Sequence, residues 1–147
     1  MTDESAAAPP RRRLYLDTSA YLCILLAEEG AAALSRETDG AELFSSVLLV
    51  LEARRNLVRL AREGALEADQ YQACLDRVES DVEAFVLRDL TLDLCRSTVV
   101  PPVLTPRSLD LAHLRTALWF DAIESLDRFI TTDESQKRAA RDLGLPL

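Results

Sequence analysis

The stretch that most constrains the fold is residues 14–20, which read Leu-Tyr-Leu-Asp-Thr-Ser-Ala. Three apolar residues lead into Asp17, two hydroxyl residues follow, and an apolar helical pattern then begins. A short apolar strand that turns directly into a helix is typical of parallel α/β sheets, which bind ligands at the carboxyl edge of their strands. We therefore expect Asp17 to lie at that edge, where it either caps the helix or belongs to a site.

Short apolar runs alternate with longer amphipathic ones along the rest of the chain. This pattern predicts strands over 13–17, 41–45, 83–87 and 128–132, and helices over 19–28, 30–38, 46–63, 66–80, 89–98, 109–120 and 134–143. Strands that alternate with helices predict a three-layer α/β/α sandwich with a central, mostly parallel sheet. We expect a single domain over 13–147, because a chain of 147 residues suits one core, after a disordered leader over 1–12.

The composition narrows the function classes. A net charge of −8 argues against a protein that binds polyanions through a basic surface, and 5% aromatic residues argue against base stacking. An acidic nuclease is still possible, since bound cations can bridge carboxylates and phosphates. Three widely spaced cysteines predict buried thiols and no disulfide or zinc site. The sequence has neither a signal core nor about 18 consecutive apolar residues, so we expect a cytoplasmic protein without membrane contact.

Four acids occupy chemically informative positions. Asp17 and Asp133 follow apolar runs, where each is also a possible helix cap. Asp110 opens an apolar helix, where it can offset the helix dipole after a Ser108 cap. Glu52 lies within another helix and can pair with a neighbouring arginine. Carboxylates that gather at one sheet edge repel one another unless cations lie among them, and oxygen ligands favour Mg²⁺ or Mn²⁺.

The helix predicted over 46–63 has two distinguishable faces. An apolar arc is expected to face the core, and it consists of Val47, Val50, Leu51, Leu57, Val58 and Ala61. The opposite arc carries Glu52, Arg55, Arg59 and Arg62. It is either a solvated surface, with a Glu–Arg pair worth about 0.2–0.5 kcal/mol, or a carboxylate aimed at a site with arginines along the substrate path. In the second case Arg55 and Arg59 are the candidates for contact with a nucleic-acid backbone.

The chain contains four motifs in this order: LYLDTSAYL at 14–22, VLEARRNLVR at 50–59, RSLDLAHLRTAL at 107–118 and RFITTDESQKRAARDLGLPL at 128–147. Together they resemble the PIN-domain ribonucleases, specifically the VapC toxins of bacterial toxin–antitoxin systems. The resemblance covers residues 14–147. It implies a Rossmann-like sandwich and a Mg²⁺-dependent endoribonuclease that leaves 5′-phosphate and 3′-hydroxyl ends. It also implies a homodimer and a cognate antitoxin that occludes the site, within a larger toxin–antitoxin assembly.

The resemblance also implies site residues. The catalytic and metal-binding quartet is Asp17, Glu52, Asp110 and Asp133, holding Mg²⁺, for which Mn²⁺ can substitute. Thr18 and Thr131 match hydroxyl positions that support the carboxylates. The alternative function is a non-catalytic PIN-like binding or regulatory module.

Two positions stay open at this point. Asp121 and Asp127 are alternatives to Asp133 as the fourth acid, and we prefer Asp133 because it directly ends a predicted strand. His113 lies three residues after Asp110, on the same helical face. Many members of the family carry a similar histidine, but bound metals can activate water without an imidazole, so we interpret His113 as a packing residue.

Overall fold

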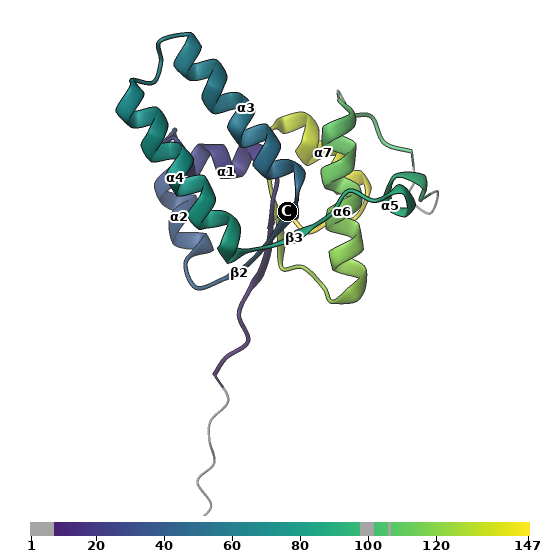
Figure 1. Cartoon of the computed structure of the whole chain (residues 1–147). Helices are drawn as coiled ribbons and strands as arrows, with labels where there is room; N and C mark the ends of the chain where they lie inside the picture. The colour runs from purple at the N-terminus through teal and green to yellow at the C-terminus, as the bar shows by residue number, and fades with distance from the viewer. Residues whose placement is uncertain (1–7, 98–101, 106) are drawn as a thin grey trace, which may run out of the picture.

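The computed structural model describes residues 8–97, 102–105 and 107–147. Within them, four parallel strands form one sheet in the order β3-β2-β1-β4: β1 (Arg13–Leu16), β2 (Glu42–Ser46), β3 (Phe85–Arg88) and β4 (Arg128–Ile130). The described residues also form seven helices: α1 (Thr18–Leu25), α2 (Ala31–Thr38), α3 (Leu48–Arg62), α4 (Ala68–Ala84), α5 (Leu92–Arg96), α6 (Ser108–Ile123) and α7 (Glu134–Asp142). The predicted α/β/α sandwich with a central parallel sheet is confirmed (Figure 1).

Strand β1 lies inside the sheet, and its side chains alternate between the two core layers, as the two-residue repeat of a strand requires. Tyr15 packs under α6 and α7 in a cluster with Phe44 and Phe129. Leu14 and Leu16 face the opposite layer, where α1 and α2 cover the sheet. All three β1 side chains are at most 1% exposed. Burial on both faces fixes the end of β1 firmly, and with it the backbone of Asp17.

Helices α3 and α4 form a hairpin that packs beside α1 (Figure 1). The buried side chains of α3 recur every four residues, at Leu49, Ala53 and Leu57. The core arc predicted for this helix is only partly right, because Leu57 is fully buried but Leu51 is 66% exposed and Val58 is 46% exposed. The face that contacts α1 and α4 instead follows Leu49, Ala53 and Leu57. Glu52, on the arc opposite the predicted core, is half-buried.

Several element boundaries differ from the predicted ones. Helix α4 continues to Ala84 and β3 starts at the next residue, so the predicted break near residue 80 is wrong. Strand β4 ends at Ile130, which places Asp133 after a two-residue link instead of directly at the strand end. Helix α6 starts at Ser108, so Ser108 is not its N-cap; Arg107 occupies that position without a side-chain hydrogen bond to the helix.

One smaller expectation needs correction. Cys23 is buried as predicted, but Cys74 is half-buried and Cys95 is exposed at the end of the short helix α5. At the end of the expected leader over 1–12, the Arg12 carbonyl accepts a hydrogen bond of 2.8 Å from the Glu42 amide. Residues 1–7 lie outside the described residues. Among the described helices, none combines the length and the apolar character needed to cross a bilayer.

Candidate active site

The carboxyl ends of β1 and β4 lie side by side at the point where the order of the strands in the sheet reverses. From β1 the chain proceeds to β2 and β3 on one side, and it then crosses to β4 on the other side of β1. Open parallel sheets bind ligands at such a switch point. The Asp17 amide donates to the Ile130 carbonyl at 3.1 Å, which extends the β1–β4 pairing up to the acid itself.

Asp17 is the N-cap of α1 and is only 4% exposed. Its Oδ1 accepts hydrogen bonds from the Ser19 hydroxyl at 2.6 Å and from the Ala20 amide at 3.1 Å. Burial raises the pKa of the Asp17 carboxyl, and the hydrogen bonds from Ser19 and Thr131 offset only part of that rise. No described side chain forms an ion pair with Asp17, so its negative charge is costly where it stands.

A hydroxyl bridge joins the ends of β1 and β4. The Ser19 Oγ lies 3.1 Å from the Thr131 Oγ1 and accepts a hydrogen bond of 3.0 Å from the Thr132 amide. Thr131 in turn accepts from the Asp133 amide at 3.1 Å. Thr131 thus contacts Ser19 and the backbone of Asp133, and the Ser19 hydroxyl donates to Asp17. Thr18, the other hydroxyl residue that the resemblance implies, donates to Glu52.

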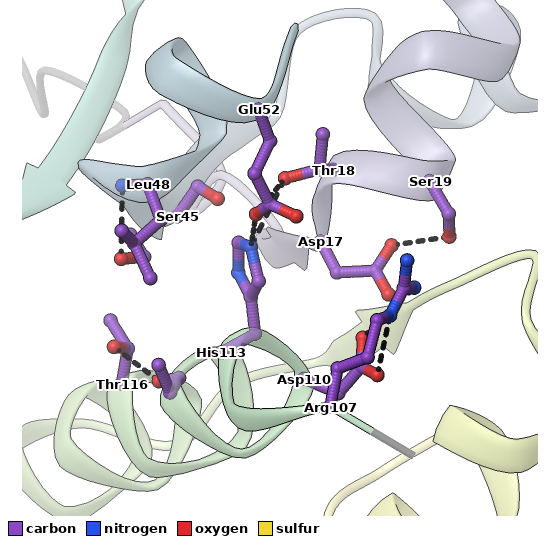
Figure 2. A network of polar contacts seen from close by, with 12 residues as sticks. Asp17, Thr18, Ser19, Ser45, Leu48, Glu52, Arg107, Asp110, His113 and Thr116 are labelled. Carbon is purple, nitrogen blue, oxygen red and sulfur yellow. Dashed lines mark hydrogen bonds and ion pairs between the residues drawn. The ribbon is translucent and has the colours of Figure 1, made fainter. Parts of the chain in front are cut away.

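Glu52 reaches the site from α3 and receives two hydrogen bonds on the same oxygen (Figure 2). Its Oε1 lies 2.8 Å from the Thr18 hydroxyl and 2.9 Å from the Nε2 of His113. Burial alone raises the pKa of the Glu52 carboxyl, but the hydrogen bonds from His113 and Thr18 contribute to lowering it by more. Glu52 is thus held in its ionised form.

Asp110 lies in the first turn of α6 and is 9% exposed. The Arg107 guanidinium contacts both of its oxygens, with Nε 3.3 Å from Oδ2 and Nη2 3.5 Å from Oδ1 (Figure 2). The hydrogen bond and charge of Asp110 raise the pKa of Arg107 most, and the charges of Glu52 and Asp133 raise it further. Arg107 is therefore a cation that interacts with three of the four acids.

Asp133 caps α7, because its Oδ1 accepts the Gln136 amide hydrogen at 3.0 Å. The buried Gln136 side chain donates to the Asp110 carbonyl at 2.9 Å, which ties α7 to α6. The other candidates for the fourth acid hold loop backbone elsewhere. Asp127 accepts from the amide of Arg13, at the start of β1, and Asp121 accepts from the Leu126 amide. Of the three, Asp133 is the one at the carboxyl edge.

The two arginines predicted to contact substrate lie on the exposed side of α3. Arg59 pairs with Glu63 at 2.9 Å, an exposed i,i+4 bridge that stabilises the helix by about 0.3–0.5 kcal/mol. Arg55 is exposed and lies one turn beyond Glu52. The structure brings neither guanidinium into contact with the acids.

Three of the four carboxylates at this edge share one feature. The hydrogen bonds to Glu52 fall on Oε1, the one to Asp133 falls on Oδ1, and those from Ser19 and Ala20 to Asp17 fall on Oδ1. The second oxygen is left for a ligand, and an all-oxygen donor set suits Mg²⁺ or Mn²⁺. In the described part of the chain, however, no three Asp, Glu, His or Cys side chains lie close enough to share one ion.

The sequence pattern did not single out Ser19, Arg107 or Gln136, and it assigned His113 to packing. Each of these residues acts through a partner that is distant in sequence or on a neighbouring turn. The one available signal was the Ser-Thr richness beside Asp17 and Asp133. Neither a family model nor a curated protein matches this chain.

Proposed function

We propose that the chain is a Mg²⁺-dependent endoribonuclease of the PIN type, acting as the toxin of a cytoplasmic toxin–antitoxin pair. The observation that carries this proposal is a set of carboxylates at the switch point of a parallel sheet, in which hydrogen bonds from the fold fall on one of the two oxygens. Asp17, Glu52 and Asp133 come from three different segments, and the hydrogen bonds that they accept from Ser19, His113 and Gln136 each fall on one oxygen of the carboxylate. Asp110 is the fourth member, and its oxygens become available when Arg107 moves aside.

In this proposal Asp17 and Asp110 hold Mg²⁺, and Glu52 and Asp133 complete the site. The bound cation would supply a nucleophilic water at neutral pH and stabilise the charge that develops on the phosphate. Ser19 and the Ala20 amide fix the Asp17 carboxylate, while Thr18 and His113 keep Glu52 ionised and oriented. Arg55 and Arg59 contact the RNA backbone along α3.

The decisive variant is Asp17→Asn, which keeps the helix cap and removes the charge. We expect it to abolish Mg²⁺-dependent cleavage of RNA in vitro and growth arrest on expression, with an unchanged circular dichroism spectrum. Asp127→Asn is the matched control, since Asp127 lies at the opposite end of β1 and should leave cleavage intact. Full RNA cleavage by Asp17→Asn would refute the assignment.

A non-catalytic PIN-like binding or regulatory module is the second candidate. It is favoured by the contact of Arg107 with both Asp110 oxygens, an arrangement in which an arginine and not a metal neutralises the acid. Calorimetric titration with Mn²⁺ separates the two functions. A nuclease should bind Mn²⁺ and lose that binding in Asp17→Asn, whereas a module of this kind should bind little Mn²⁺ in either form.

The partners are part of the proposal: a homodimer and a cognate antitoxin that covers the acidic edge. Light scattering of the purified chain measures the first, with twice the 16.3 kDa monomer mass expected. For the second, co-expression with the product of a small adjacent reading frame should relieve growth arrest. Continued arrest in the presence of that product would count against an antitoxin.

A further inference from the structure

The only histidine of the chain, His113, is buried in the middle of a polar network on α6. Its side chain is 3% exposed, and both of its ring nitrogens have hydrogen-bond partners. Both ring nitrogens of a buried histidine need polar partners, and here one of those partners is an acid of the candidate site, Glu52. The network joins β1, α3 and α6, the elements that carry Tyr15, Glu52 and His113.

The contacts of His113 have a definite order. On one side, Nδ1 lies 2.9 Å from the Tyr15 hydroxyl. On the other, Nε2 lies 2.9 Å from the Glu52 Oε1 and 3.1 Å from the Thr18 Oγ1. Figure 2 shows the ring directly beneath the Glu52 carboxylate. His113 is thus interposed between a core hydroxyl and a site acid.

The environment of Tyr15 indicates the direction of these hydrogen bonds. Tyr15 is fully buried, and its phenol carries one hydrogen that it can donate. If that hydrogen is donated to Nδ1, the ring proton resides on Nε2 and is donated to Glu52. The second ring nitrogen of a histidine fixes its tautomer in this way at many sites.

We propose that His113 is a positioning residue for Glu52, and that Tyr15 fixes the ring so that its Nε2 proton is directed at Oε1. Both internal hydrogen bonds of Glu52 then fall on Oε1, and Oε2 is the oxygen presented to a ligand. This inference rests on the proposed function, since the ligand of Oε2 is the cation of the nuclease site. His113 itself touches no substrate, because both ring nitrogens are already engaged.

Two amide substitutions separate hydrogen bonding from packing. In His113→Gln the side-chain amide nitrogen replaces Nε2 and can still donate to Glu52. In His113→Asn the amide reaches only the place of Nδ1, so Glu52 loses its donor. Phe120→Leu is the packing control, because Phe120 lies on the same helix and packs against the Tyr15 ring without any polar contact to Glu52. Thermal denaturation identifies the variants that fold.

The first readout is Mn²⁺ affinity measured by calorimetry on the full chain. We expect His113→Asn to bind Mn²⁺ roughly 10–100-fold more weakly, the range found when a partner of a metal ligand is removed. His113→Gln should regain most of the affinity, and Phe120→Leu should match the wild type. Equal affinity in His113→Asn and the wild type would overturn the inference, as would equal weakness in the Gln and Asn variants.

The second readout needs no metal. Because the chain has one histidine, its imidazole signals in a long-range ¹H–¹⁵N spectrum are assigned without ambiguity. We expect a proton on Nε2 in the wild type and a loss of that preference in Tyr15→Phe. An Nε2 without a proton would overturn the inference even if the site binds metal.

Asp17→Asn, included in the titration, distinguishes failure of the His113 positioning role from failure of the proposed nuclease site. If Asp17→Asn loses Mn²⁺ and His113→Asn retains it, the positioning role fails and the nuclease site stands. If the wild type binds no Mn²⁺, both the site and the positioning role are refuted.

Discussion

At the scale of single residues, the site consists of charges that the fold only partly neutralises. Asp17 is the extreme case, since it is 4% exposed and no described side chain pairs with its charge. Glu52 and Asp110 each have a nearby basic group, His113 and Arg107 respectively. Because these acids have different neighbouring groups, substitutions that remove the negative charge should change stability by different amounts at the four positions.

Asp17→Asn should make the metal-free protein more stable at neutral pH. Burial raises the pKa of Asp17, so the folded state holds this proton more tightly than the unfolded chain does. The cost of the ionised carboxyl is therefore absent below the unfolded value of 3.8, appears as pH rises through the folded pKa, and is then constant.

Thermal denaturation in chelator at several pH values measures this effect, with each kcal/mol gained raising Tm by roughly 2–4 °C. The advantage of the variant should disappear below pH 3.8, where the carboxyl of the wild type is protonated in both states. An advantage that persists unchanged into acid would show that charge is not its cause.

Arg107→Ala should strengthen Mn²⁺ binding several-fold. The guanidinium neutralises Asp110, and its charge also acts on Glu52 and Asp133, so an incoming cation has to displace it. Calorimetry against Arg138→Ala, an exposed arginine on α7, controls for a general change in net charge. Weaker binding in Arg107→Ala alone would instead make Arg107 a supporting residue of the cation site.

At the scale of elements, the helices are positioned by contacts that their own sequences do not reveal. Helix α3 is the clearest case, because its buried stripe is set by α1 and α4. Leu57→Ala should cost about 2–5 kcal/mol of unfolding free energy, since Leu57 is 0% exposed. Leu51→Ala, at 66% exposure, should change it by less than about 0.5 kcal/mol. Urea denaturation of the pair checks the orientation of the helix, and equal losses would contradict it.

The short helix α5 depends on one arginine of α6. The Nη1 of Arg115 donates to the carbonyls of Leu94, Cys95 and Ser97, at 3.1, 3.0 and 2.5 Å. Hydrogen bonds from a charged donor contribute about 1.5–3 kcal/mol, so Arg115→Ala should speed amide exchange in α5 by roughly ten- to hundredfold. Amides of α7 serve as the internal reference, and unchanged exchange in α5 would refute this role.

Local patterns were sufficient to predict the order and type of the elements, and they placed Asp17 and Asp133 near strand ends. Strand alternation and helix caps are properties of adjacent residues, which explains this success. The buried face of α3 was predicted only in part, at Leu57, because the spacing 49, 53, 57 competes with an equally apolar arc that includes Leu51 and Val58. Only the position of α4 decides between them.

The polar contacts of the site could not be predicted from local patterns, because they also depend on how distant segments pack together. His113 and Tyr15 are 98 residues apart, and His113 and Glu52 are 61 apart. Arg107 is close to Asp110 in sequence, but its position in the acidic site also depends on the charges of Glu52 and Asp133, which come from other parts of the chain. Residue types at helix starts and strand ends suggested an acidic site, whereas its hydrogen-bond partners required the tertiary structure.

At the scale of the whole molecule, the four acids come from four segments and their site exists only when the sheet is complete. A cation that binds there should therefore stabilise the whole fold. At a hundredfold excess over its dissociation constant, a ligand adds about 2.7 kcal/mol. We expect Mg²⁺ or Mn²⁺ to raise the Tm of the wild type and of Asp127→Asn by several degrees, and to leave Asp17→Asn unchanged. A Tm insensitive to both cations in the wild type would argue for the non-catalytic module.

Asp17 and Asp133 are helix caps as well as members of the proposed metal site, and this has a consequence for how related sequences would evolve. Under the proposed function, a lineage released from RNA cleavage would still need a cap-forming side chain before α1 and before α7, and aspartate already satisfies that need. Selection on folding alone would thus preserve these two acids, while Glu52 and Asp110 would be free to drift. Loss of activity among descendants should be diagnosed at positions 52 and 110, where the backbone does not depend on the carboxylate.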